Sequence, residues 1–277
     1  MNPLVSTDWL AAHLTEVRVV DASWYMPDEK REPAKEFLAA HIPGAVFFDI
    51  DGIADHAAGL PHMMPPADDF AAAMRTLGIN SGDTIVVAYD GSGIFSAPRV
   101  RWALRRMGHE TVFVLDGGFP KWRREGRPVE SGAATPIPGN FTARPVAALA
   151  RDYDAVLKHV KNRDAQILDA RSSSRFTGEE KEPRPGLKSG HMPGAVNIHW
   201  RSLLTEAGTL KSDDELRALF TRKGVDMRAP IVTTCGSGIS AAILMLALEK
   251  LGAANVALYD GSWAEWGGRD DAPVATG

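Results

Sequence analysis

Cysteine is nearly absent from this sequence, and its scarcity excludes several kinds of protein at once. Among 277 residues there is one cysteine, Cys235, so no intramolecular disulfide can form and no metal site can be built from several thiolates. If Cys235 is reactive, the chain offers no second thiol to resolve it, and any group that it acquires must leave to an external acceptor. An unpaired thiol also favours a reducing, cytoplasmic location.

Long hydrophobic runs and a strong charge of one sign are missing as well. No apolar stretch approaches the roughly 18 residues of a membrane-spanning helix. The first residues show no basic segment followed by an apolar one, as a secretory signal would. The net charge of -4 gives no electrostatic reason to expect nucleic acid or an anionic membrane as a partner. We therefore expect a globular protein with neither kind of partner.

The sequence does contain a repeat that spans about half the chain. Residues 41–46 (His-Ile-Pro-Gly-Ala-Val) return as residues 191–196 (His-Met-Pro-Gly-Ala-Val), and residues 90–94 (Asp-Gly-Ser-Gly-Ile) return as residues 235–239 (Cys-Gly-Ser-Gly-Ile). Further matches pair residues 19–22 with 167–170 and residues 116–119 with 260–263. Because the matches keep their order and a similar offset, a whole domain has been duplicated.

The repeat predicts two domains joined by a short connection. We expect an N-terminal domain over residues 1–130, a linker over residues 131–145 and a C-terminal domain over residues 146–277. The linker assignment follows from the Gly, Pro and small residues of its first part, which mark an irregular segment.

Each half shows the pattern of an α/β domain. Short apolar runs rich in β-branched residues, such as residues 84–89 and 230–234, predict strands that are buried on both faces. Residues 241–251 predict a buried helix that Gly252 ends, and residues 256–259 predict the next strand. This alternation of strand and helix indicates right-handed crossovers and a mainly parallel sheet in each half.

Cys235 is expected where a buried strand ends and a helix begins. The glycines at 236 and 238 free the backbone, so that several N–H groups can point at one centre, and the helix N-terminus adds partial positive charge. Such surroundings stabilise a thiolate, and equally the terminal anionic sulfur of a persulfide. The alternative, a small buried hydrophobe, is the common fate of a lone cysteine, but open α/β sheets place ligands at this position.

A cysteine-dependent phosphatase is the sharpest alternative from another class of enzyme. Its phosphate-binding loop has an arginine six positions after the cysteine, whereas this chain has Ala241 there and no cation in the loop. Residues 236–238 are not followed by Gly-Lys-Ser/Thr either, which excludes a nucleotide-binding P-loop.

Taken together, these residues resemble the tandem-domain rhodanese family over essentially the full chain. Residues 37–45 are similar to the family's N-terminal motif, and residues 256–266 to its C-terminal motif. The resemblance implies an α/β fold with a parallel sheet of about five strands flanked by helices in each domain, and activity in the C-terminal domain alone. Asp90 stands in place of the cysteine in the first repeat; since a carboxylate cannot be the sulfur nucleophile, we expect that domain to be non-catalytic.

The loop after the cysteine distinguishes two branches of this family. Thiosulfate sulfurtransferases resemble Cys-Arg-Lys-Gly, whose two cations suit a dianionic substrate, whereas mercaptopyruvate sulfurtransferases resemble Cys-Gly-Ser-Gly, the sequence of residues 235–238. The resemblance therefore implies 3-mercaptopyruvate as the small-molecule sulfur donor, with no metal ion and no organic cofactor. The loop residues that would contact the substrate are Gly236, Gly238, Ile239 and Ser240.

The same resemblance places the cations for the substrate on residues 175–184. Arg175 and Arg184 match the branch's arginines that hold the carboxylate and carbonyl oxygens, and a planar guanidinium suits this bidentate task. Nearby carboxylates, which include Glu182, could pair with these arginines.

A relay of three side chains is the last feature that the resemblance implies. His62 and Asp51 match a histidine and an aspartate of the first domain that face the cysteine loop, and with Ser237 they would protonate the leaving pyruvate enolate. The Cys235 thiolate would take the substrate sulfur and hold it as a persulfide. An external thiol such as thioredoxin or a small thiol, or cyanide in a test tube, would then accept it.

Two other functions remain open at this point. A thiosulfate sulfurtransferase would use the same Cys235, although the uncharged loop argues against thiosulfate as the main donor. A non-enzymatic persulfide carrier would load and unload Cys235 on a partner protein, although the paired arginines favour a small-molecule donor.

Overall fold

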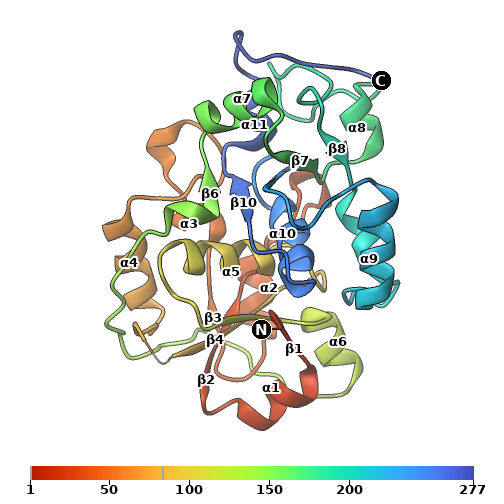
Figure 1. Cartoon of the computed structure of the whole chain (residues 1–277). Coiled ribbons are helices and arrows are strands. Elements are labelled where there is room, and N and C mark those ends of the chain that lie inside the picture. Colours follow the sequence, from red (N-terminus) through yellow and green to blue (C-terminus); the bar gives the residue numbers. More distant parts are fainter. Residues whose placement is uncertain (1, 83) are drawn as a thin grey trace. The chain divides into compact units, whose positions relative to one another are not determined.

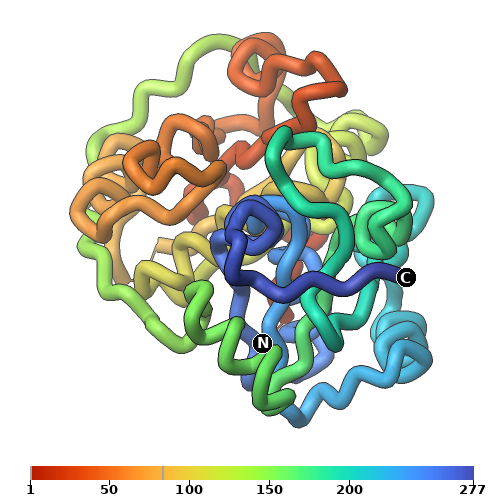
Figure 2. The backbone as a smooth tube through the Cα atoms, turned by 90° about the horizontal axis from the view of Figure 1, so that it is seen from above, coloured from red at the N-terminus to blue at the C-terminus, as the bar shows by residue number. Residues whose placement is uncertain are grey.

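The computed structural model describes residues 2–82 and 84–277, and its contacts divide the chain into two compact units (Figure 1). Unit 1 comprises the residues up to Asp55, Met64–Val146 and Thr205–Leu210. Unit 2 comprises His56–Met63, Ala147–Leu204 and Lys211–Gly277. The trace in Figure 2 follows the chain by colour, from the red and yellow of the first repeat to the blue of the second. The boundaries at residues 131 and 146 stay a prediction, since each unit also takes a short segment from the other half of the sequence.

Each unit contains one parallel sheet of five strands, and the two sheets have the same strand order. In unit 1 the order is β1 (Leu4–Val5), β5 (Val112–Leu115), β4 (Ile85–Tyr89), β2 (Val17–Asp21) and β3 (Val46–Phe47). In unit 2 it is β6 (Ala150–Arg151), β10 (Val256–Tyr259), β9 (Ile231–Thr234), β7 (Gln166–Asp169) and β8 (Val196–Asn197). The predicted fold, a duplicated α/β domain with a parallel sheet, is confirmed.

Helices alternate with these strands along the chain, as the sequence pattern predicts. Unit 1 has α1 (Thr7–His13), α2 (Pro33–Ala39), α3 (Ile50–Ile53), α4 (Ala67–Thr76), α5 (Ala97–Arg106) and α6 (Gly118–Arg124). Unit 2 has α7 (Tyr153–Asn162), α8 (Ser173–Thr177), α9 (Asp213–Arg222), α10 (Ala241–Lys250) and α11 (Ser262–Trp266). Single turns of 3₁₀ helix lie at Pro27–Glu29, His56–Ala58, Ala147–Leu149 and Trp200–Leu203. No helix among the described residues is both long and apolar enough to cross a membrane.

The predicted element bounds differ from the observed ones by one residue, for local reasons. The strand begins at Ile231 rather than at Pro230, since proline has no N–H for the ladder. The buried helix ends at Lys250, and Gly252 follows with a positive φ of 91°, a backbone conformation that glycine adopts at helix ends.

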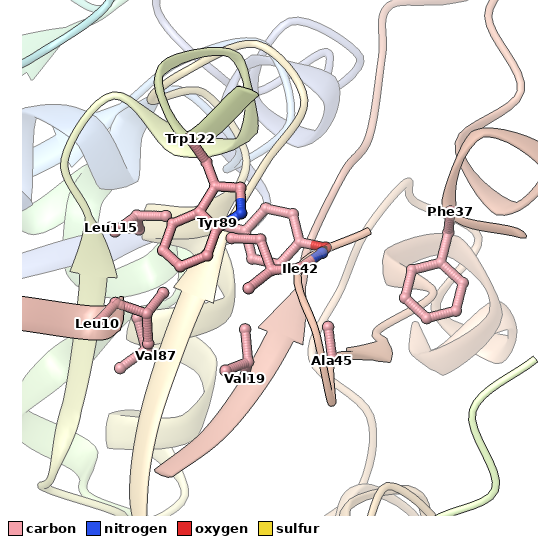
Figure 3. Close-up of a cluster of buried hydrophobic side chains, with 9 residues drawn as sticks. All are labelled: Leu10, Val19, Phe37, Ile42, Ala45, Val87, Tyr89, Leu115 and Trp122. Atoms are coloured by element: carbon pink, nitrogen blue, oxygen red, sulfur yellow. The ribbon is translucent and has the colours of Figure 1, made fainter. Parts of the chain in front are cut away.

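The core of each unit is an apolar cluster between the sheet and its helices. In unit 1 the cluster consists of Leu10, Val19, Phe37, Ile42, Ala45, Val87, Tyr89, Leu115 and Trp122 (Figure 3). In unit 2 it consists of Tyr153, Val156, Ile167, Met192, Val232, Tyr259, Trp263, Trp266 and Ala272. A fully buried tryptophan repeats between them: the indole N–H of Trp122 donates to the Pro128 carbonyl at 2.7 Å, and that of Trp266 to the Pro273 carbonyl at 2.8 Å.

We predict that Trp266→Ala lowers the free energy of unfolding by about 3–5 kcal/mol, because it leaves a large cavity and an unpaired carbonyl. Urea denaturation followed by circular dichroism measures the change. The control is Ile137→Ala, whose side chain is 86% exposed, and which should change stability by no more than about 0.5 kcal/mol. Equal losses in both variants would contradict the assignment of Trp266 to the core.

Candidate functional site

The structure places Cys235 in the turn between β9 and α10, as the sequence predicts. Its side chain is buried, with the residue 2% exposed, and the thiol is free. The Gly238 N–H donates to the Cys235 Sγ at 3.2 Å. Two contacts with the start of α11 hold the turn: the Trp263 N–H donates to the Cys235 carbonyl at 2.9 Å, and the Cys235 N–H donates to the Ser262 Oγ at 3.3 Å. The turn is therefore held in place by hydrogen bonds, with the Gly238 N–H directed at the sulfur.

The equivalent turn of unit 1 shows what this backbone can bind. The Asp90 carboxylate there accepts four backbone N–H groups at 2.8–3.0 Å, from Ser92, Phe95, Ser96 and Ala97. The two turns are held alike, since the Phe119 N–H donates to the Asp90 carbonyl at 3.0 Å, as Trp263 does to Cys235. Gly-Ser-Gly-Ile follows both residues, so the cradle of N–H groups belongs to the shared backbone. In unit 1 an internal carboxylate fills it; in unit 2 the N–H of Gly238 donates to the thiol sulfur.

Arg175 lies beside the cysteine turn. A Cβ atom placed on Gly236 would be 3.1 Å from the Arg175 Nη2, so the guanidinium rests against the backbone next to Cys235. Glu182 binds one edge of the guanidinium, accepting from Nε at 3.2 Å and from Nη2 at 2.5 Å. Because a guanidinium has five N–H groups, three remain for another ligand, and the free edge can bind a carboxylate bidentately.

A second arginine, Arg171, holds Glu182 in the position from which it binds Arg175. It donates to both oxygens of Asp169 and, through Nη1, to Glu182 at 2.7 Å, and the side chains of all three residues are nearly fully buried. Burial alone would oppose its charge, but the two carboxylates raise the pKa of Arg171 above its ordinary value. The four charged groups sum to zero, so Glu182 orients Arg175 without leaving an unpaired buried charge.

His62 contacts Ser237 in the same turn. The His62 Nδ1 lies 3.0 Å from the Ser237 Oγ and 3.3 Å from the Ser237 carbonyl oxygen, and both residues are buried. His62 adopts a φ of 61°, which few residues other than glycine take and which persists only where the surroundings impose it. Although the sequence places His62 in the first repeat, its segment His56–Met63 packs as part of unit 2.

Other candidates are placed less directly. Asp51 lies in α3 of unit 1, where its Oδ2 accepts from the Trp24 indole N–H at 2.9 Å; its place in a relay with His62 stays a prediction. Arg184 is half-buried on the irregular segment after α8, and its contact with substrate stays a prediction too. Ile239 is buried, and Ser240 lies at the start of α10, so both flank the cradle.

Sequence reasoning missed Arg171 and Asp169 as members of the site. The available signal was the repeat itself: Asp169-Ala170-Arg171 stands where the first repeat has Asp21-Ala22-Ser23. A residue that differs between two otherwise matched segments is a candidate for the function that only one of them performs.

Comparisons with known proteins show which chains this one is similar to. A model of the rhodanese-like domain matches residues 6–125 and 152–269. The 3-mercaptopyruvate sulfurtransferase of Escherichia coli K12 is 47% identical over 274 residues, which cover 98% of this chain and 96% of that protein. The thiosulfate sulfurtransferase of Bos taurus is 45% identical over 272 residues, covering 95% and 91%. The crystal structure of SseA from Escherichia coli, described as a 3-mercaptopyruvate sulfurtransferase, superposes with a TM-score of 0.87 at 43% identity, covering 95% of this chain and 99% of that chain.

We predict that Gly236→Ala moves the Arg175 guanidinium, because a new methyl group would lie 3.1 Å from its Nη2. The φ of Gly236 is not positive, so the protein should lose no more than about 1 kcal/mol of stability. The measurement is the ¹H–¹⁵N resonance of the Arg175 Nε–H, compared between wild type and variant, with Arg175→Lys to assign it. An unchanged resonance would mean that the guanidinium does not rest on Gly236.

Proposed function

We propose that this chain, which belongs to the rhodanese family in its two-domain form, moves sulfur from 3-mercaptopyruvate to a thiol through a persulfide on Cys235. The chain is an enzyme, a sulfurtransferase, and not a non-catalytic carrier. One observation carries the choice of donor: an uncharged turn holds the thiol, and a single guanidinium with a free edge lies beside it. That arrangement suits a substrate with one carboxylate.

Substrate binding is the first step of the proposed mechanism. The free edge of Arg175 binds the carboxylate of 3-mercaptopyruvate. Glu182 holds the guanidinium in a fixed orientation while the substrate binds. Arg184 is proposed to bind the carbonyl oxygen. The backbone of Gly236 to Ser240 surrounds the substrate sulfur, so that sulfur, carbonyl and carboxylate are oriented together.

Sulfur transfer follows by nucleophilic attack. The Cys235 thiolate attacks the thiol sulfur of the substrate, an S–S bond forms, and the S–C bond breaks with its electron pair passing to carbon. The leaving group is the enolate of pyruvate, which takes one proton to become pyruvate. The persulfide that remains loses its own proton, and its terminal anionic sulfur is stabilised by the same kind of N–H groups that bind Asp90 in unit 1.

Ser237 and His62 are proposed to supply the proton. The Ser237 hydroxyl donates to the enolate while the His62 ring, 3.0 Å away, returns a proton to the serine oxygen. Asp51 is proposed to orient His62. No metal ion or organic cofactor enters any step of this proposal.

The second half-reaction regenerates the thiolate. An acceptor thiolate attacks the outer sulfur of the persulfide, and Cys235 leaves as the thiolate. The absence of a second cysteine means that the acceptor is external, and thioredoxin or a small thiol fits that chemistry. Because a free thiol must be kept reduced, we propose a cytoplasmic location.

Thiosulfate is the second candidate donor. The bovine relative, 45% identical, carries the name thiosulfate sulfurtransferase, so similarity at this level does not separate the donors. Thiosulfate is a dianion, and the turn that holds Cys235 contains no cation between residues 235 and 240. We therefore propose thiosulfate as a secondary donor.

We predict that wild-type protein has a kcat/KM for 3-mercaptopyruvate at least about tenfold that for thiosulfate, a difference of about 1.4 kcal/mol in transition-state binding. Cys235→Ser should abolish turnover of both donors, because no other residue can carry the sulfur. Pyruvate release and sulfur transfer are measured in parallel. A preference for thiosulfate would overturn the donor assignment and keep the nucleophile; turnover in Cys235→Ser would overturn both.

We predict that Arg175→Lys raises the KM for 3-mercaptopyruvate about tenfold or more, since lysine cannot bind Glu182 and a carboxylate as a planar fork. The matched control is Arg228→Lys, at a side chain that is 92% exposed and paired with Asp226. It should leave KM unchanged. Equal KM values in both variants would remove Arg175 from the substrate site.

A further inference from the structure

Unit 1 contains a cavity of about 640 Å³ at the carboxyl ends of its strands. Its lining includes Asp21 at the end of β2, Ser23, Ala40 after α2, Gly91 and Phe119. The cavity lies at the counterpart of the catalytic turn, beside Asp90, and plays no part in the proposed sulfur transfer.

In unit 2 the corresponding place is occupied by the Arg171 guanidinium. It donates to Asp169 and, at 2.8 Å, to the Gly190 carbonyl, and its Cζ lies 4.1 Å above the centre of the Trp263 ring. A carboxylate, a carbonyl and an aromatic face thus form a complete site for one guanidinium.

The same site is present in unit 1 without the guanidinium. The repeat pairs Asp21 with Asp169, Ala40 with Gly190 and Phe119 with Trp263, and all three unit 1 residues line the cavity. Local geometry supports the pairing, since the Ser23 N–H donates to the Asp21 Oδ1 at 2.9 Å and the Arg171 N–H donates to the Asp169 Oδ1 at 2.9 Å. Where unit 2 has Arg171, unit 1 has Ser23, whose side chain is too short to fill the space.

A second difference puts a carboxylate in the wall of this cavity at a position where the catalytic unit has a guanidinium. Glu36 precedes Phe37 and Arg175 precedes Phe176, and each phenylalanine stacks on a histidine of the repeated motif, at 4.1 Å in unit 1 and 3.8 Å in unit 2. A carboxylate therefore replaces the substrate-binding guanidinium in the lining.

The Asp21 carboxylate is buried, 4% exposed, with hydrogen bonds from Ser23 and Tyr89 but no cation bonded to it among the residues that the structure describes. The arginines of the lining have other partners. Arg31 pairs with Glu36, Arg124 donates to the Ala207 carbonyl at 3.3 Å, and the exposed Arg123 has its Cζ 5.8 Å from the Phe119 ring centre. The place that Arg171 fills in unit 2 is thus left to an external ligand.

We infer that this cavity binds a small molecule with a guanidinium or amidinium group, which stacks on Phe119 and donates to Asp21 and to the Ala40 carbonyl. In unit 1 an external ligand would provide the planar cation, whereas in unit 2 the Arg171 side chain provides it. Its remaining atoms extend toward the mouth, where Arg31, Arg123 and Arg124 would favour a ligand whose far end is anionic or neutral.

Binding should weaken in acid. Burial raises the pKa of Asp21 to about 6, so the carboxylate loses its charge as the pH falls through that value, and with it the attraction for a cation. The other charged or titratable groups around it are Asp90, Glu36, Tyr25, Tyr89, Arg31, Arg123 and Arg124. Hydrogen bonds from Arg31 and Tyr25 keep the pKa of Glu36 below its ordinary value, so Glu36 stays charged through this range.

The test is a titration of the full-length protein with methylguanidinium, followed by ¹H–¹⁵N spectra at pH 7.5 and pH 5. We expect saturable shifts of the Ser23, Gly91 and Phe119 amides at the higher pH and at least about tenfold weaker binding at the lower. Urea, a planar but uncharged molecule of similar shape, should not compete at the same concentration. Absence of saturable shifts at these amides would overturn the inference.

Two variants separate the cavity from other sites. Ser23→Arg should place a guanidinium in the cavity from within the chain, and Asp21→Asn should remove the charge; each should weaken binding at least about tenfold. Ser131→Arg, which adds the same charge at an exposed position, is the matched control and should bind as wild type does. Unchanged binding in either folded cavity variant would contradict the site. Sulfur transfer should continue in Ser23→Arg, so the inference and the proposed function fail independently.

Discussion

At the carboxyl end of each central strand the turn directs backbone N–H groups at one point, with four groups in unit 1 and the Gly238 N–H in unit 2, and the proposed chemistry depends on this contact. In unit 1 the point is taken by the Asp90 carboxylate, with four N–H bonds. In unit 2 it is taken by the Cys235 Sγ, which accepts from Gly238. Because the donors are peptide groups, the fold orients them before any ligand arrives, and they need no reorganisation as negative charge develops on sulfur. Ser262 and Trp263 hold the catalytic turn in that shape.

Duplication has produced one scaffold with two patterns of charge. In unit 2 a thiol stands in the cradle and two guanidiniums lie nearby, one buried with Asp169 and one facing the turn. In unit 1 Asp90 and Glu36 take the places of Cys235 and Arg175. We propose that these differences favour an anionic substrate beside Cys235, although strand order and turn are shared by the two units. In this proposal, a few charged side chains on a shared backbone set the specificity.

Much of the fold could be predicted from the sequence, because strand and helix patterns and turn residues are local and appear twice. The cysteine turn could be predicted for the same reason. The repeat marks Arg171 as a difference between the two halves, but its contacts could not be predicted, since Asp169 and Glu182 lie apart in the sequence and meet at Arg171 only in the folded chain. His62 shows the limit most clearly. It lies 175 positions before Ser237, and no pattern near it indicates that its segment packs with unit 2.

The central claim is that Cys235 holds the transferred sulfur as a persulfide, and intact-protein mass spectrometry after a single exposure to 3-mercaptopyruvate tests it most directly. Without an acceptor, wild-type protein should gain the mass of one sulfur atom, located on Cys235 by peptide mapping, and should release one pyruvate per chain. A thiol added afterwards should remove that mass. Pyruvate release without any gain of mass on Cys235 would contradict the account, because the sulfur would then have left the substrate without passing to Cys235.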